Sequence, residues 1–241
     1  MDARRRQYLE LMGITPWRRR ASEPAEPAAR TRDESVHPET PAASDLSAPP
    51  DLEAAPRADL DWPELERAVA SCTACGLHAT RTQPVFGVGD RRAEWMIVGE
   101  APGAEEDRQG APFVGRAGQL LSAMLRALGL AREQVYIANV LKCRPPNNRD
   151  PTAEEAAACE AHLHAQIALV RPRILLVVGR VAAQNLLKSD APLARLRGRA
   201  HRYADGSPLV VTYHPAYLLR APQDKAKAWQ DLLLARSEAA R

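Results

Sequence analysis

Four short runs of apolar and β-branched residues stand out along the chain from residue 94 onward. They cover Glu94–Gly99, Val135–Leu141, Arg173–Gly179 and Leu209–Tyr213. Runs of this length and composition are typical of β-strands. We expect each run to form one strand.

Helical periodicity fills the stretches between these runs. Ala117–Leu130 carries one apolar stripe with the spacing of an amphipathic helix, formed by Leu120, Leu121, Met124, Leu125 and Leu128. Thr152 and Glu155 have the spacing of a capping box, which predicts a helix that runs from there to about Val170. Two further helices are expected over Ala182–Leu187 and Gln223–Ala235.

Strands that alternate with helices indicate βαβ units. The predicted fold class is therefore α/β, a three-layer α/β/α arrangement around a central four-stranded parallel sheet. Ligands bind such sheets beyond the carboxyl ends of the strands. Glu100 directly follows the first strand, Asn139 lies near the end of the second, and His214 directly follows the fourth. We expect these three residues at one edge of the sheet.

The first 61 residues have a different composition. Residues 21–61 hold seven of the 20 prolines and ten acidic residues against three arginines, with few branched or aromatic residues. Such a segment buries too little apolar surface to offset its ordering entropy, so we predict a disordered acidic linker. The predicted organisation is an arm over 1–20, this linker over 21–61, and one domain over 62–241.

Charge is distributed unevenly over these parts. Residues 1–20 carry six arginines against two acidic residues, and the whole chain has a net charge of +3, so the domain behind the acidic linker is basic. A basic domain is compatible with a polyanionic partner, and equally with ordinary solvated charge. Neither a membrane-spanning apolar run nor a signal peptide is expected, which predicts a cytoplasmic protein without a membrane partner.

The arm combines apolar residues with two arginine triplets. Tyr8, Leu11, Met12, Ile14 and Trp17 lie between or beside the triplets. Three interpretations remain open: a segment that docks onto a replication or repair protein, non-specific DNA contact through the arginines, or a helix packed on the domain. We expect the protein to be a monomer.

The chain has four cysteines, drawn from three segments. Cys72 and Cys75 form a CxxC pair, whereas Cys143 and Cys159 stand singly. In a reducing compartment such a set is more often metal-binding than disulfide-forming. The spacing favours an iron–sulfur cluster over zinc, because structural zinc sites usually pair two CxxC knuckles. Four unrelated buried cysteines are the third interpretation, and Cys159 on its alanine-rich helix fits that one best.

Several motifs occur together in one order: Gly99-Glu100-Ala101-Pro102-Gly103, Pro112-Phe113-Val114-Gly115, Asn139-Val140-Leu141-Lys142-Cys143, and His214-Pro215-Ala216. In this order they resemble the family-4 uracil-DNA glycosylases, over roughly residues 62–238. The resemblance implies a hydrolase that acts in DNA repair by removing uracil from uracil-containing DNA. It also implies a 4Fe-4S iron–sulfur cluster held by Cys72, Cys75, Cys143 and Cys159.

The resemblance implies roles in uracil binding as well. Phe113 stacks on the flipped base, Asn139 reads its amide edge, and Glu106 lies beside the C5 edge, where it excludes the thymine methyl group. Ala101 occupies a position where some relatives have an aspartate that orients water. His214 donates to the developing charge on uracil O2.

The remaining implied roles concern water and the DNA stack. Glu100 is the first candidate to position the attacking water, and Asn148 is the second. Leu218, Leu219 and Arg220 form the DNA wedge that fills the vacated stack. Plainer interpretations remain: Glu100 and Asn139 as loop caps, Phe113 as core, His214 as a loop residue and the leucines as a core helix.

Two other functional classes compete with the glycosylase. A cluster-bearing module that binds DNA or proteins has no need to keep Glu100, Phe113, Asn139 and His214 together. A small-molecule nucleotide hydrolase does not explain the Leu-Leu-Arg segment or the arginines of residues 195–202. The pocket residues therefore favour the glycosylase.

Overall fold

The computed structural model describes residues 61–241 together with Leu11. The predicted arm and linker lie outside the described residues, apart from Leu11 and Asp61. Among the helices that the structure describes, none is long and apolar enough to cross a membrane.

The centre of the domain is a six-stranded mixed sheet with the strand order β1-β3-β2-β4-β6-β5. Its strands are β1 Val88–Gly89, β2 Trp95–Gly99, β3 Tyr136–Asn139, β4 Ile174–Val178, β5 Ala200–Arg202 and β6 Pro208–Thr212. The four predicted strands are confirmed as the inner strands β3, β2, β4 and β6, which pair in parallel. The expected four-stranded, all-parallel sheet was wrong, because β1 and β5 add an antiparallel strand at each edge.

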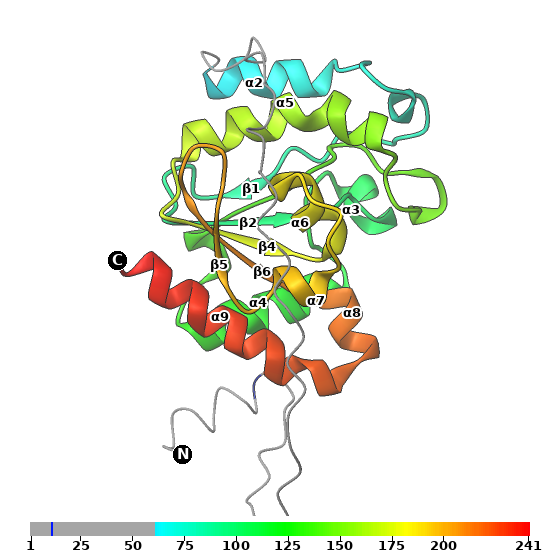
Figure 1. The fold of residues 1–241 in the computed structure, drawn as a ribbon. Coiled ribbons are helices and arrows are strands. Elements are labelled where there is room, and N and C mark those ends of the chain that lie inside the picture. The colour runs from blue at the N-terminus through cyan, green and yellow to red at the C-terminus, as the bar shows by residue number, and fades with distance from the viewer. Residues whose placement is uncertain (1–10, 12–60) are drawn as a thin grey trace, which may run out of the picture. The chain divides into compact units, whose positions relative to one another are not determined.

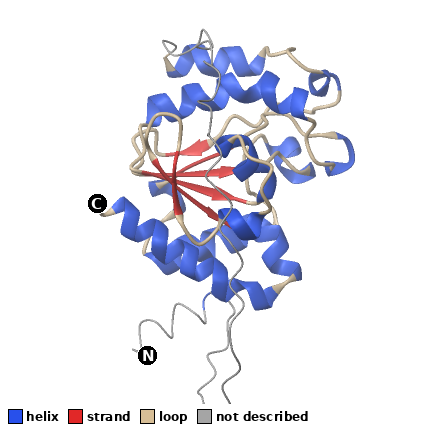
Figure 2. Cartoon of the chain, viewed as in Figure 1, coloured by secondary structure: helices blue, strands red, loops and turns tan. Residues whose placement is uncertain are grey.

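The helices pack on both faces of this sheet, which gives the three layers seen in Figure 1 and Figure 2. Alternate residues of β2 show the two sides: Met96 and Val98 belong to one core cluster, and Trp95 and Ile97 to the other. The first cluster is covered by α5 Ala153–Val170, α6 Arg180–Leu187 and α7 Leu193–Leu196, with α2 Trp62–Ala70 packed on α5. The second is covered by α4 Arg116–Leu128, α8 Pro215–Arg220 and α9 Lys225–Ala239.

The predicted helices are confirmed with small differences at their ends. The capping box of α5 is present: the Glu155 N–H donates to Thr152 Oγ1 at 3.2 Å, and the Thr152 N–H donates to Glu155 Oε2 at 2.9 Å. The helix α4 ends at Gly129, whose φ of 87° suits a residue without a side chain. The pattern did not predict α2, α7, α8 or α3 Ala104–Gln109. Apart from α2, each of these has six residues or fewer, too short to show a period.

The register of the parallel strands places their carboxyl ends at one edge. Gly99 lies opposite Asn139 on β3, and Val178 of β4 lies opposite Thr212 of β6. The loops that follow these strands include the short 3-10 helix η3 Pro146–Asn148, and α3 and α8 begin there. This alignment brings the chain after β2, β3 and β6 into one place.

Candidate active site

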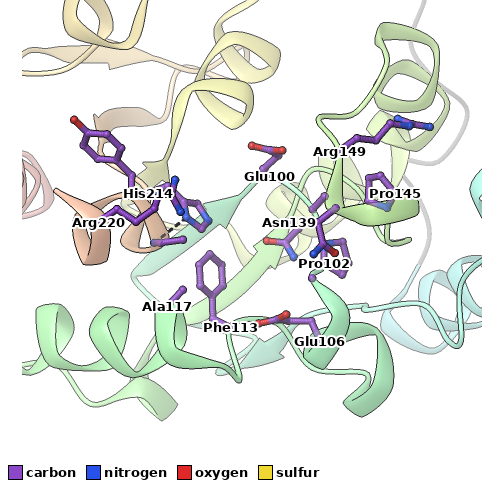
Figure 3. Close-up of a pocket in the computed structure, with 15 residues that line it drawn as sticks. Glu100, Pro102, Glu106, Phe113, Ala117, Asn139, Pro145, Arg149, His214 and Arg220 are labelled. Atoms are coloured by element: carbon purple, nitrogen blue, oxygen red, sulfur yellow. Dashed lines mark hydrogen bonds between the residues drawn. The ribbon is translucent and has the colours of Figure 1, made fainter.

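A cavity of about 480 Å³ lies at this edge of the sheet (Figure 3). Predicted site residues from separate segments line it together: Glu100, Ala101, Glu106, Phe113, Asn139, Asn148, His214 and Arg220. The fold therefore brings these eight predicted residues, from separate segments, to one cavity. Their individual roles depend on the geometry of each side chain.

Asn139 ends β3 at the floor of the cavity. Its side chain is almost fully buried, and its Oδ1 has no hydrogen-bond partner among the residues that the structure describes. Gly99 on the neighbouring strand allows this position, because a Cβ there would lie 2.4 Å from Asn139 Oδ1. A buried acceptor without a partner is costly, so this oxygen is suited to a ligand that brings a donor.

His214 caps the amino end of α8. Its Nδ1 accepts a hydrogen bond from the Ala216 N–H at 3.1 Å, so in the neutral ring the proton is on Nε2. The pKa of His214 is lowered to about 4, mainly by burial and in addition by the charge of Arg220, whereas Glu106 opposes the shift. At neutral pH the ring is therefore an uncharged Nε2–H donor.

Phe113 lies close to His214, with ring centroids 5.6 Å apart and ring planes inclined by 29°. Its backbone is left-handed, with a φ of 55°, which is rare for a bulky residue. Gly118 in α4 lets the chain approach, since a Cβ there would lie 1.7 Å from the Phe113 carbonyl oxygen. Next to Phe113, the Val114 N–H donates to Glu106 Oε1 at 3.2 Å. Glu106 thus ties α3 to the segment that carries the aromatic ring.

Glu100 is partly buried and lies across the cavity from Glu106 (Figure 3). The pKa of Glu100 is raised to about 7, mainly by burial and in addition by the charge of Asp150, whereas Arg180 opposes the shift. Asp150 and Arg180 form an ion pair with an Oδ2–Nη2 distance of 2.6 Å. A carboxyl group with a pKa near neutrality is suited to general acid–base work.

Asn148 lies at the exposed rim. Both Asn147 and Asn148 have left-handed backbones, with φ values of 55° and 53°. The Asn148 Oδ1 accepts a hydrogen bond from Arg144 Nε at 2.7 Å. The side-chain oxygen of the second water candidate is thus already engaged, whereas the Glu100 carboxylate accepts no hydrogen bond from the residues that the structure describes.

The four cysteines line a second, smaller pocket on the α5 side of the sheet, and all four are free thiols. Arg81 Nη1 donates to Cys143 Sγ at 2.9 Å, and the Lys142 N–H donates to Cys159 Sγ at 3.3 Å. No three His, Cys, Asp or Glu side chains within the described part of the chain are grouped closely enough to hold one metal ion. Four thiols around one pocket, with donors aimed at two of the sulfurs, fit a cluster with several metal atoms.

Comparison with known proteins agrees with this geometry. Residues 86–233 match the Uracil DNA glycosylase superfamily. The type-4 uracil-DNA glycosylase of Archaeoglobus fulgidus is 47% identical over 167 residues, which cover 66% of this chain and 84% of the relative. That of Thermotoga maritima is 47% identical over 153 residues, 63% of this chain and 80% of the relative. That of Pyrobaculum aerophilum is 40% identical over 182 residues, 73% and 93% respectively. The chain belongs to the type-4 uracil-DNA glycosylases.

One residue of the predicted DNA wedge is not exposed in this type-4 uracil-DNA glycosylase. Leu218 is fully buried in the core cluster under α4 and α9, so it is a core residue rather than an exposed wedge residue. Leu219 is 39% exposed, and Arg220 is exposed and lines the cavity. The helical period of α8 explains the difference, because one face of a surface helix must pack on the domain.

The sequence did not point to several residues that shape the site of this type-4 uracil-DNA glycosylase. Asp150, in the segment between η3 and α5, and Arg180, the first residue of α6, act on Glu100, and Tyr217 and Arg149 also line the cavity. Arg180 follows a predicted strand directly, which was the one local signal that could have found it. Asp150, Tyr217 and Arg149 are recognised only by where the fold places them.

Proposed function

We propose that this protein removes uracil from DNA by hydrolysing the N-glycosidic bond, which leaves an abasic site for base excision repair. One observation carries the proposal. In a chain of the type-4 uracil-DNA glycosylases, one cavity combines a buried amide whose oxygen has no partner within the described part of the chain, an aromatic ring and a neutral Nε2–H donor. These groups match the polar edge, the flat face and the O2 atom of uracil.

Base recognition begins with extrusion of the uridine from the duplex, because its glycosidic bond is out of reach inside the stack. Phe113 stacks on the flipped ring. Asn139 Oδ1 accepts from uracil N3–H, and its amide nitrogen donates to O4. Cytosine presents an acceptor at N3 and a donor at C4, so it meets the same amide with both polarities reversed. Glu106 lies beside C5 and leaves no room for the thymine methyl group.

Bond cleavage separates charge. The bond between C1′ and N1 breaks, its electron pair leaves with uracil, and the sugar becomes an oxocarbenium-like cation. His214 Nε2–H donates to uracil O2, where negative charge develops. Because the pKa of His214 is about 4, the ring stabilises the uracil anion by a hydrogen bond and does not transfer a proton to it.

Glu100 positions the water that completes the reaction. In its ionised form the carboxylate accepts the water proton while the oxygen bonds to C1′, and the uracil anion leaves and takes its proton from solvent. Ala101 contributes a methyl group to the cavity wall, so Glu100 supplies the carboxylate. Asn148 is the second candidate for contact with this water, after release from Arg144.

Two further parts complete the proposal. Leu219 enters the gap that the flipped base leaves in the stack, and Arg220 contacts the DNA beside it, while buried Leu218 anchors α8. Cys72, Cys75, Cys143 and Cys159 hold a 4Fe-4S cluster. Through these ligands the cluster would tie together the chain after α2, the chain after β3 and helix α5.

A direct assay tests the proposal. Purified protein is incubated with a labelled oligonucleotide that holds one uracil, and abasic sites are cleaved with alkali; matched oligonucleotides with thymine or cytosine serve as controls. We expect cleavage at uracil alone, and weaker discrimination between uracil and cytosine for Asn139→Asp, since its carboxylate has no donor. Binding of uracil-containing DNA without abasic-site formation would contradict the proposal and support a binding module.

A further inference from the structure

The backbone at Phe113 is strained at the point where the site needs an aromatic ring. A left-handed φ of 55° costs free energy for a phenylalanine and persists only where the surroundings enforce it. The ring is almost fully buried and lies against His214 (Figure 3). Whatever holds the peptide groups around Phe113 therefore sets the position of the ring.

Charged side chains hold both of these peptide groups. On one side, Arg132 Nη2 donates to the Pro112 carbonyl oxygen at 2.6 Å. On the other side, Glu106 Oε1 accepts from the Val114 N–H at 3.2 Å. Glu106 lines the cavity, whereas Arg132 lies outside its lining, on the 3-10 helix η2 Arg132–Gln134 that precedes β3.

The position of the Arg132 guanidinium costs free energy, because part of it is buried. The residue is half-buried, and its Nη1 is buried with no hydrogen-bond partner among residues 61–241 and Leu11. Burial also lowers the pKa of Arg132 from its ordinary value. If the Arg132 side chain only filled space, an apolar side chain would stabilise the fold more, because removing a charge from water costs free energy. The short hydrogen bond to Pro112 is the compensating contact.

Helix α4 is the third element, beside Arg132 and Glu106, that holds the backbone at Phe113. Since a Cβ at Gly118 would lie 1.7 Å from the Phe113 carbonyl oxygen, the chain is pressed against this helix and has no free space there. Arg132 donates to the carbonyl of Pro112, the residue just before Phe113. The strained residue is thus enclosed by Arg132, Glu106 and α4.

We propose that Arg132 is a positioning residue for base recognition: its hydrogen bond to the Pro112 carbonyl holds Phe113 in the left-handed conformation and presets the ring for stacking on the flipped base. The proposal rests on the uracil-excising function given above and assigns part of its specificity to a residue that does not touch the base. Preorganisation of this kind raises affinity because the ordering cost is met before the ligand arrives.

A double-mutant cycle between Arg132 and Phe113 tests the proposal. We expect Arg132→Met to lower kcat/KM for uracil-containing DNA by about tenfold and to weaken inhibition by free uracil by a similar factor, the range for loss of one charge-assisted hydrogen bond. Binding of the same duplex without uracil should not change. In the Phe113→Ala background, Arg132→Met should have no further effect, since the ring that it positions is gone.

Two variants complete the design. Arg132→Lys keeps a cationic donor without the planar fork, and we expect it to lose only about threefold in kcat/KM. If Arg132→Met does not fold, the same cycle is run with Arg132→Lys, whose loss should vanish with Phe113→Ala. Arg126→Met removes an exposed arginine of α4 and should match the wild type.

The results of these assays distinguish a failure of the positioning role of Arg132 from a failure of the proposed uracil-excising function. Wild-type protein that does not excise uracil overturns both. Wild-type protein that excises uracil, together with Arg132 variants that match it, overturns the positioning role alone. Equal losses of Arg132→Met in the wild-type and Phe113→Ala backgrounds, with a lower Tm, would make Arg132 a residue for stability only.

Discussion

Glu100 should make uracil excision depend on pH near neutrality. Burial raises the pKa of its carboxyl to about 7, and the proposed base is the ionised form. The rate therefore falls as the pH falls through 7, because protonation removes the acceptor for the water proton. His214 adds no second step in this range, since its pKa is about 4 and it stays neutral throughout.

The size of the effect follows from one titrating group. With a pKa of about 7, about 91% of Glu100 is ionised at about pH 8 and about 9% at about pH 6, so the rate should drop roughly tenfold between them. Glu100→Gln should be slower at every pH and should not show this fall of the rate below pH 7, the acidic limb of the pH profile. Asp150→Asn removes a charge that raises the pKa of Glu100, so the limb should move to lower pH; Arg180→Gln should move it to higher pH.

The assay is kcat/KM for a uracil-containing oligonucleotide between about pH 5.5 and 9 at constant ionic strength. This ratio reports the free enzyme, and constant salt is needed because DNA binding is salt-dependent. A rate that does not vary with pH would refute the role of Glu100. The same would follow if Glu100→Gln kept the limb with an unchanged midpoint.

Three further predictions concern the imidazole, the cluster and the first 60 residues. His214→Ala should slow single-turnover excision by roughly 100-fold with nearly unchanged DNA binding, as expected for a hydrogen bond that strengthens in the transition state; equal losses of binding and rate would indicate a structural residue. Anaerobically purified protein should contain iron and absorb broadly near roughly 400 nm, and Cys143→Ala should lower both iron content and folded yield; stoichiometric zinc without iron would contradict the 4Fe-4S cluster. Deletion of residues 1–60 should change excision on short oligonucleotides by about two- to threefold at most, since every pocket residue lies beyond them; if the arm is a docking segment, its loss should show only as weaker recruitment when a partner protein is present. A large drop on naked oligonucleotide that disappears at higher salt would assign the arm to DNA contact instead.

The apolar runs in the sequence predicted the four inner strands correctly, because helices cover these strands on both faces of the sheet. Every residue of β2 and β4 is buried, so each strand appears in the sequence as an uninterrupted apolar run. The edge strands carry no such mark: β1 has two residues, and β5 includes His201 and exposed Arg202. Their place in the sheet comes from pairing with β3 and β6, which a local pattern does not record.

The sequence by itself determined the family, the inner strands and eight of the residues that line the cavity, because the motifs sit directly after strands and parallel strands end at one edge. Only the tertiary structure decided how those residues behave. The Nδ1 of His214 is engaged by α8, Glu100 titrates near 7 beside the Asp150–Arg180 pair, and Leu218 belongs to the core. Protonation and burial depend on what packs around a side chain, and those neighbours come from segments far apart in the chain. Arg132 reaches Pro112 across 20 residues of sequence, and only the fold brings them together.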